Sequence, residues 1–308
     1  MARVSVHHRQ GASGMKTIGF IGLGIMGAPM ARNLVSAGFT VRGYDLSDSA
    51  VAELASAGGV ATESIADAVD GADVVATMLP ADPHVLSVVL GEDGVLEHLK
   101  PGTLLIDFST VTPDTSRKVA SAGAEKGVRV LDAPVSGGQA GAVDGVLSIM
   151  VGGSPADFEA AQPVFDAVGK VAALVGPSGS GQVVKAANQL VVGGTYALVA
   201  EAILLMEASG VDASAGLDVL AGGLAGSRIL ELKRRSMLAR EFDPGFRIDL
   251  HHKDMGIVLD AARRAELALP FAFQVAAHVQ AARALGLGDR DHSALLAVAE
   301  RFTGRMGA

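Results

Sequence analysis

The sequence contains no cysteine, and this absence sets the first limits on its chemistry. Disulfide bonds and thiolate-ligated metal sites are both excluded. The other residue types show no ligand spacing, so we predict no metal site. A chain without cysteine is compatible with the reducing cytoplasm, which is the location that we expect.

The chain also lacks an excess of basic residues and a long uninterrupted apolar run. Lysine and arginine number 25 against 33 acidic residues, which gives a net charge of -8, so we expect neither nucleic acid nor a membrane surface as a partner. The uncharged run between Lys185 and Glu201 is too short and too polar for a membrane span, which needs about 20 apolar residues. Residues 1–14 lack an apolar core, and we interpret them as a flexible extension.

The 308 residues are 49% hydrophobic and include 39 glycines, enough for two domains with large cores. Short apolar runs alternate with helical patterns as far as residue 178, which predicts an α/β domain with a parallel sheet over residues 15–178. Beyond that point the pattern is helical only. The predicted second domain, residues 179–308, is joined to the first by a long helix.

A glycine-rich turn follows the first predicted strand, residues 17–21. It reads Gly22, Leu23, Gly24, Ile25, Met26, Gly27 and leads directly into a helical pattern. In a strand-turn-helix setting such glycines allow a tight turn, close approach of the backbone to a pyrophosphate, and close helix packing. The helix N-terminus adds free N–H groups. This turn predicts a Rossmann-type dinucleotide site.

Asp45 ends the second predicted strand, 21 positions after Gly24. A carboxylate at about this spacing accepts the ribose hydroxyls of NAD, so Asp45 favours NAD(H), with NADP(H) as the alternative. Asp45, or Ser47, could instead cap the following helix.

The carboxyl ends of three later strands lie where ligands of a parallel sheet bind. These ends carry Met78, Leu79 and Pro80 at the end of the strand at 73–79, Ser109 and Thr110 after the strand at 103–107, and Ser136, Gly137 and Gly138 after the strand at 128–133. The last group can form an anion-binding nest of backbone N–H groups, or simply a flexible loop. The earlier loops could equally be ordinary turns and helix starts.

Lys185 lies near the start of the first predicted helix of the second domain. In a helix it shares one face with Gln182, Asn188 and Gln189. This face is either a solvated helix start or a catalytic ammonium with substrate-positioning amides. Predicted helices follow at 212–224, 226–240, 249–267, 270–286 and 292–302, with Asp212, Ser227, Asp249 and Asp291 as caps.

Taken together, six ordered motifs resemble those of the β-hydroxyacid dehydrogenases. They are the glycine-rich turn, Met78-Leu-Pro, Asp107-Phe-Ser-Thr, Asp132-Ala-Pro-Val-Ser-Gly-Gly, Gly179-Ser-Gly-Gln-Val-Val-Lys185 and Lys253-Asp254. The resemblance implies that Lys185 is the general acid and that Ser136, Gly137 and Gly138 bind a substrate carboxylate. It also implies that Asn188 or Gln189 contacts substrate, that Ser109 or Thr110 lies near the nicotinamide, and that Lys253 lies at the mouth of the site.

Residues 242–251 and 287–295 are more similar to the tartronate semialdehyde reductases of this family than to its 3-hydroxyisobutyrate dehydrogenases. We therefore expect NAD(P)H-dependent reduction of tartronate semialdehyde to D-glycerate and the reverse oxidation, with 3-hydroxyisobutyrate or another short β-hydroxyacid as the alternative substrate. Arg247, Asp249, His251 and His292 are candidates for reading an extra substrate hydroxyl. A dinucleotide-binding module without catalysis is a different class, but it predicts a broken lysine or nest. The apolar helices of the second domain predict a homodimer or homotetramer.

Overall fold

A computed structural model describes residues 16–304, so the predicted extension at 1–14 lies outside the described residues. The strands are β1 Thr17–Ile21, β2 Thr40–Tyr44, β3 Val60–Ala61, β4 Val74–Thr77, β5 Leu104–Asp107, β6 Arg129–Asp132, β7 Val135–Ser136, β8 Leu147–Gly152 and β9 Gly169–Gly176. The helices among them are α1 Gly27–Ser36, α2 Asp48–Ser56, α3 Ile65–Val69, α4 Asp82–Leu90, α5 Val95–His98, α6 Pro113–Glu125, α7 Gly138–Val143 and α8 Pro155–Val168. The predicted fold class is confirmed.

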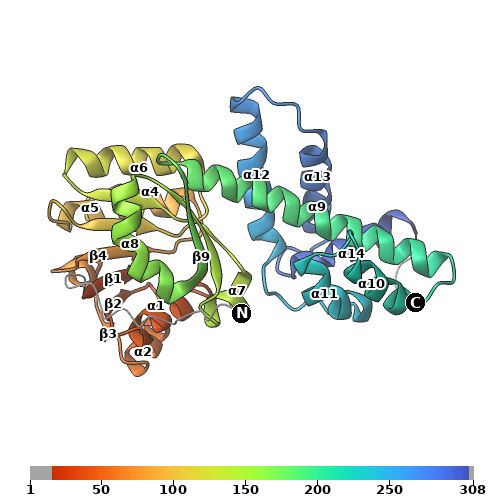
Figure 1. Cartoon of the computed structure of the whole chain (residues 1–308), viewed down its shortest axis with the longest axis horizontal. Coiled ribbons are helices and arrows are strands. Elements are labelled where there is room, and N and C mark those ends of the chain that lie inside the picture. The colour runs from red at the N-terminus through yellow and green to blue at the C-terminus, as the bar shows by residue number, and fades with distance from the viewer. Residues whose placement is uncertain (1–15, 305–308) are drawn as a thin grey trace, which may run out of the picture.

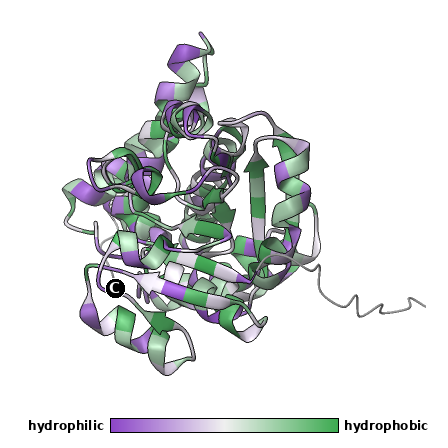
Figure 2. Ribbon diagram, turned by 90° about the vertical axis from the view of Figure 1, so that its left-hand side faces the viewer, coloured by the Kyte–Doolittle hydropathy of each residue, from purple (hydrophilic) through white to green (hydrophobic). Residues whose placement is uncertain are grey.

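One sheet organises this first domain, with strand order β3-β2-β1-β4-β5-β6-β8-β7 and β9 beside β8. The strands from β3 to β6 are parallel. The central strands β1, β4 and β5 are buried on both faces, because α1, α2, α7 and α8 pack on one face and α3 to α6 on the other. Figure 2 shows these strands largely in the hydrophobic colour. The order reverses between β1 and β4, and such a switch point is where α/β sheets bind ligands.

The prediction of a purely parallel sheet is wrong at one edge. Strand β8 runs antiparallel to both β6 and β7. The connection between β7 and β8 contains only the six-residue helix α7, about 9 Å long at 1.5 Å per residue. A parallel connection would have to return along the whole of β8, a strand of about 20 Å. The chain therefore turns back after α7, and β8 starts at the same end of the sheet at which β7 ends.

The second domain is helical and is built around one long helix, α9 (Figure 1). Its elements are α9 Ser180–Ala208, α10 Ala213–Gly222, α11 Arg228–Ala239, α12 Ile248–Arg264, α13 Pro270–Ala284, the short 3₁₀ helix η1 His292–Ala294 and α14 Leu295–Phe302. The predicted caps Asp212, Ser227 and Asp291 are confirmed, since each side chain accepts from a backbone N–H one turn ahead.

Asp249 is not a cap. Helix α12 begins one residue earlier, and Arg247 occupies its N-cap position without a side-chain bond. The first N–H groups of α12 are satisfied by another segment instead, since Ile248 and Asp249 donate to the carbonyl oxygens of Arg290 and Gly288, at 2.9 Å each. A helix start already paired in this way needs no capping side chain.

Helix α9 corrects a second expectation. Within residues 16–304 it is the one helix long and apolar enough to cross a membrane by length and composition, although its uncharged run between Lys185 and Glu201 predicts a segment too short and too polar for that. Three charges, those of Lys185, Glu201 and Glu207, spread over 29 residues do not prevent a helix from meeting this criterion, which core helices of globular domains also meet. Here α9 packs against α10 to α14 and against β8, and its buried side chains include Gln182, Lys185 and Gln189.

Candidate active site

The glycine-rich turn joins β1 to α1 at the switch point of the sheet. A Cβ atom on Gly22, which has φ +94°, would lie 2.4 Å from the Met78 carbonyl oxygen, and one on Gly27 would lie 1.8 Å from the Gly22 carbonyl oxygen. A Cβ on Gly24 would meet nothing within 4 Å. The backbone is thus closely packed at Gly22, against the loop after β4, and at Gly27, against the turn itself, and it is open at Gly24, where Ile25 and Met26 follow. This shape fits the approach of a pyrophosphate to the start of α1.

Asp45 stands beside this turn, at the end of β2. Its carboxylate accepts from the backbone N–H of Leu23 at 2.7 Å and from that of Ser47 at 2.8 Å. Ser47 occupies the N-cap position of α2 but makes no side-chain capping bond. The contact to Leu23 therefore orients the carboxylate toward the glycine-rich turn, as a ribose-binding role requires.

The loops after β4 and β5 are held against each other by side chains. The Leu79 N–H donates to the Ser109 hydroxyl at 2.8 Å, and the Ser109 N–H donates to the Asp107 carboxylate at 3.0 Å. Thr77, at the end of β4, donates to the same carboxylate oxygen at 2.8 Å. Burial raises the pKa of Asp107 to about 6, against the lowering effect of these hydrogen bonds. The structure thus brings residues 78–80 and 109–110 together beside the glycine-rich turn.

Lys253 reaches these two loops from the helical domain. Its ammonium donates to the carbonyl oxygens of Pro80 at 3.0 Å and Thr110 at 2.5 Å, and it lies 3.1 Å from Asp254. Lys253 therefore joins α12 to the loops after β4 and β5.

Lys185 lies in the second turn of α9, and only 6% of it is exposed. Its ammonium donates to the Val135 carbonyl oxygen at 2.8 Å and to Gln189 Oε1 at 3.1 Å. The solvated-lysine alternative is thereby excluded. Val135 directly precedes Ser136, Gly137 and Gly138, and the two glycines have φ of +141° and +63°. Positive φ values of this kind allow consecutive N–H groups to converge, as a nest requires. Because Lys185 bonds to Val135, its ammonium lies beside this predicted nest.

The surroundings of Lys185 shift its protonation equilibrium. Burial lowers the pKa of Lys185 from 10.5 to about 8, the Asp254 carboxylate opposes this shift, and the Lys253 charge adds to it. The side chain is therefore mainly an ammonium at neutral pH, yet close enough to its pKa to give up a proton. A pKa near the working pH is what general acid catalysis requires.

Gln189 and Asn188 have different surroundings. Gln189 is buried, accepts from Lys185 and from Asn188 Nδ2 at 2.8 Å, and donates to Asp254 Oδ2 at 2.6 Å. Asn188 is half-buried, and within the described part of the chain its Oδ1 has no hydrogen-bond partner. Gln189 is therefore committed to the protein, whereas Asn188 keeps an oxygen for another molecule.

The four candidates for reading a substrate hydroxyl do not line this site. Arg247 is exposed at the start of α12, and Asp249 pairs with Arg283 at 2.6 Å on the surface. His251 and His292 are buried behind α9, where His251 Nε2 lies 3.1 Å from the Gln189 carbonyl oxygen and the two Nδ1 atoms lie 3.2 Å apart. The histidines thus support the backbone that carries the site.

Three further residues belong to this network: Asp132 and Asp254, to which sequence reasoning gave no role, and Gln182, which it placed on the Lys185 face. Asp254 connects Lys253 to Gln189, Gln182 bonds to the loop after β5, and Asp132 bonds to the start of α9. All three are almost fully buried. All three stand within the quoted motifs, so a polar or acidic side chain at a motif position was the available signal.

Replacing Asp254 with asparagine should lower the pKa of Lys185 further, because it removes the carboxylate that stabilises the ammonium. The measurement is the titration of the Lys185 side chain by NMR in protein carrying labelled lysine. Asp260→Asn is the matched control, since Asp260 lies farther along α12 and pairs with Arg264 at 2.7 Å. A Lys185 titration midpoint that is the same in Asp254→Asn and in the unaltered protein would contradict this electrostatic account.

Comparison with known proteins agrees with this geometry. Residues 17–176 match the family of the NAD-binding domain of 6-phosphogluconate dehydrogenase, and residues 179–299 match a family described as NAD-binding of NADP-dependent 3-hydroxyisobutyrate dehydrogenase. An NAD-dependent L-serine dehydrogenase of Pseudomonas aeruginosa is 40% identical, over 91% of this chain and 96% of its own.

A 2-hydroxy-3-oxopropionate reductase of Escherichia coli is also 40% identical, over 92% of this chain and 97% of its own. Among solved structures, a 3-hydroxyisobutyrate dehydrogenase of Mycobacterium tuberculosis with L-serine superposes with a TM-score of 0.83 at 36% identity, covering 92% of this chain and 99% of that one. With its Rossmann domain, helical domain and shared motifs, the chain belongs to the β-hydroxyacid dehydrogenase family, the nicotinamide-dependent oxidoreductases of short hydroxy acids.

Proposed function

We propose that this protein reduces tartronate semialdehyde to D-glycerate with NADH, and catalyses the reverse oxidation, with Lys185 as the general acid. The observation that carries the proposal is the buried Lys185 ammonium bonded to Val135 beside the Ser136–Gly138 nest. A charged donor next to a carboxylate site suits a substrate with an acid group and a neighbouring carbonyl.

Lys185 is oriented for proton transfer. An ammonium has three donor hydrogens, and the Val135 carbonyl and Gln189 Oε1 take two of them. The third hydrogen is left for the substrate. Bound NADH supplies a hydride to the aldehyde carbon. As the C=O bond becomes a C–O bond, Lys185 donates its proton to the oxygen and becomes a neutral amine.

The other contacts hold the substrate in place. The N–H groups of Gly137 and Gly138 and the Ser136 hydroxyl would bind the carboxylate, and Asn188 Oδ1 would accept from the substrate's 2-hydroxyl. Of the two amides, we propose Asn188 as the one that contacts substrate, because Gln189 Oε1 already accepts from Lys185 and Asn188 and the Gln189 amide already donates to Asp254. Hydrogen-bond partners on both sides of the reacting carbon would hold the substrate aldehyde in line with the nicotinamide and Lys185.

The cofactor is held by the glycine-rich turn, by Asp45 and by the two loops after β4 and β5, which Lys253 contacts. Asp45 supports NADH as the preferred form because a carboxylate repels the additional phosphate of NADPH. We propose a cytoplasmic enzyme, in agreement with the absence of cysteine.

The choice of substrate rests on residues 242–251 and 287–295, which lie together. The His292 N–H donates to the Phe246 carbonyl at 2.9 Å, and His251 contacts the Gln189 backbone. These segments therefore support the helix face that carries Asn188. The L-serine dehydrogenase and the 2-hydroxy-3-oxopropionate reductase are equally similar to this chain, so identity alone does not separate three-carbon substrates.

Steady-state kinetics with matched substrates tests the activity. Tartronate semialdehyde and methylmalonate semialdehyde are compared with NADH and NADPH, and glycerate, 3-hydroxyisobutyrate and L-serine with the oxidised cofactors. We expect the highest kcat/KM with tartronate semialdehyde and NADH. A preference for methylmalonate semialdehyde would instead favour 3-hydroxyisobutyrate dehydrogenase activity. If NADH binds and no substrate changes its absorbance, the protein is a dinucleotide-binding module without catalysis.

Lys185→Met should lower kcat by about 10²–10⁴-fold, because it removes the acid and keeps much of the apolar stem. NADH affinity should be unchanged, since the cofactor contacts come from other residues. Lys170→Met, a change of the same type on strand β9, is the control and should behave like the unaltered protein. Turnover of the Lys185 variant at the normal rate would exclude this residue as the acid.

We also propose that the protein is a homodimer or homotetramer. Val184, Val191, Leu198 and Leu205 recur at intervals of seven on α9, and each is at least 36% exposed. An apolar stripe of this length on a helix is typical of an interface. Light scattering should give a mass of two or four times 31.1 kDa. Leu198→Glu should reduce that mass, and a monomeric unaltered protein would contradict the proposal.

A further inference from the structure

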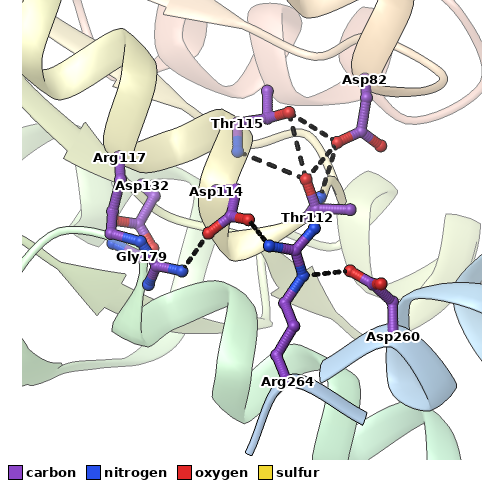
Figure 3. Close-up of polar contacts among 9 residues, drawn as sticks. All are labelled: Asp82, Thr112, Asp114, Thr115, Arg117, Asp132, Gly179, Asp260 and Arg264. Carbon is purple, nitrogen blue, oxygen red and sulfur yellow. Dashed lines mark hydrogen bonds and ion pairs between the residues drawn. The ribbon is translucent and has the colours of Figure 1, made fainter. Parts of the chain in front are cut away.

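The first turn of α9 is bound to the end of strand β6 by one buried carboxylate. Asp132 accepts from the backbone N–H of Gly179 at 2.6 Å (Figure 3). It also accepts from the backbone N–H of Gln182, at 3.2 Å. The N-cap residue of α9 is a glycine and has no side chain to offer. The helix is therefore capped from the sheet, by a residue 47 positions earlier, and not by its own sequence.

Gln182 binds the same turn to the end of strand β5. Its Nε2 donates to the Ser109 carbonyl at 2.9 Å, and its Oε1 accepts from the Val111 N–H at 3.2 Å. The side chain is completely buried. Gln182 therefore connects α9 directly to the loop after β5 and, through the bond between Ser109 and Leu79, indirectly to the loop after β4.

Glycine at two positions permits this close approach. A Cβ on Gly181 would lie 2.7 Å from the nearer Asp132 oxygen and 2.3 Å from the Met150 carbonyl oxygen, while Gly179 has φ +91°. A larger residue at 181 would push the helix away from the sheet. Gly179 and Gly181 thus allow the start of α9 to lie against the Asp132 carboxylate and the backbone of β8. Their role is close packing and not flexibility of the segment.

The ion pairs at the outer rim of the domain junction are of a different kind. Arg264 of α12 contacts Asp114 of α6 as well as Asp260 of its own helix (Figure 3). Arg264 is 60% exposed, so water and salt screen these pairs. The buried contacts of Asp132 and Gln182 are better suited to fix the geometry of the junction.

We propose that Asp132 and Gln182 are positioning residues, which hold the start of α9 on the nucleotide domain and so place Lys185 against the nicotinamide. Lys185 follows Gln182 by three residues on the same helix face, about 4.5 Å along the axis. Because the ends of β5 and β6 fix the first turn of α9, Lys185 keeps a fixed position relative to the nucleotide domain. This inference rests on the proposed role of Lys185.

Two variants test the inference by separate routes. In Asp132→Asn, an amide N–H₂ replaces one of the two carboxylate oxygens that accept from the N–H groups of Gly179 and Gln182. In Gln182→Met, a side chain of similar size can no longer bond to the Ser109 carbonyl or to the Val111 N–H. In each variant we expect faster hydrogen exchange of the amides in residues 179–185. We also expect kcat to fall by about 10–100-fold, because small misplacements of a reacting group cost rates of this order.

Other readouts distinguish positioning from general damage. The Kd for NADH should stay within about twofold in Asp132→Asn, since the Asp132 carboxylate accepts from the start of α9 and bonds neither to the glycine-rich turn nor to the two loops that contact the cofactor. The titration midpoint of Lys185 should stay unchanged in Asp132→Asn, because Asp132 is not among the charges that shift the pKa of Lys185. Asp212→Asn is the matched control. It alters a carboxylate that caps α10 through Ser214 and Ala215, far from the site, and should leave kcat unaltered.

Each outcome decides a separate point. Normal kcat in both variants, with exchange increased, would overturn the inference and reduce these residues to a structural role. Unchanged exchange in residues 179–185 would overturn the anchoring itself. If Asp132→Asn does not fold, Gln182→Met carries the test alone. Failure of the unaltered protein to turn over any substrate would count against the proposed function, while the exchange data would still support or overturn the anchoring.

Discussion

The burial of one ammonium group, that of Lys185, is the constraint on which the rest of the site depends. A lysine removed from water loses its hydration and must be given hydrogen-bond acceptors or lose its charge. The Val135 carbonyl and Gln189 supply two acceptors, and Asp254 supplies a compensating charge at longer range. This partial compensation leaves the pKa of Lys185 near 8, below the 10.5 of a solvated lysine but high enough to keep most of the ammonium protonated at neutral pH.

Each domain contributes what the other lacks. The sheet domain provides the cofactor turn, the nest and the anchors of α9, all from loops at the carboxyl ends of its strands. The helical domain provides Lys253 and Asp254 on α12, which reach back to the Pro80 and Thr110 carbonyls and to Gln189. The long helix α9 belongs to both, so its first turns are the point at which proton donor, substrate and cofactor can be held in one frame.

Much of this organisation could be predicted from local patterns. The glycine-rich turn needs only its neighbouring strand and helix to be recognised, and the face of Gln182, Lys185 and Gln189 follows from helical periodicity. The features that local patterns did not predict depend on contacts between residues distant in sequence. Strand β8 reverses because of how α7 fits the edge of the sheet, and Asp249 loses its capping role because residues 288–290 satisfy the start of α12. Asp132, Gln182 and Asp254 gain theirs only when strands and helices meet.

The most direct test of the account is the pH dependence of hydride transfer, followed in single turnovers in both directions. The pKa of Lys185 is lowered to about 8, so the ammonium needed for reduction is present below that pH and is lost above it. Reduction of the aldehyde should therefore slow above about pH 8, and oxidation of the alcohol, which needs the neutral amine, should slow below it. Rates that are independent of pH from 6 to 10 in both directions would contradict the central claim that Lys185 carries the proton.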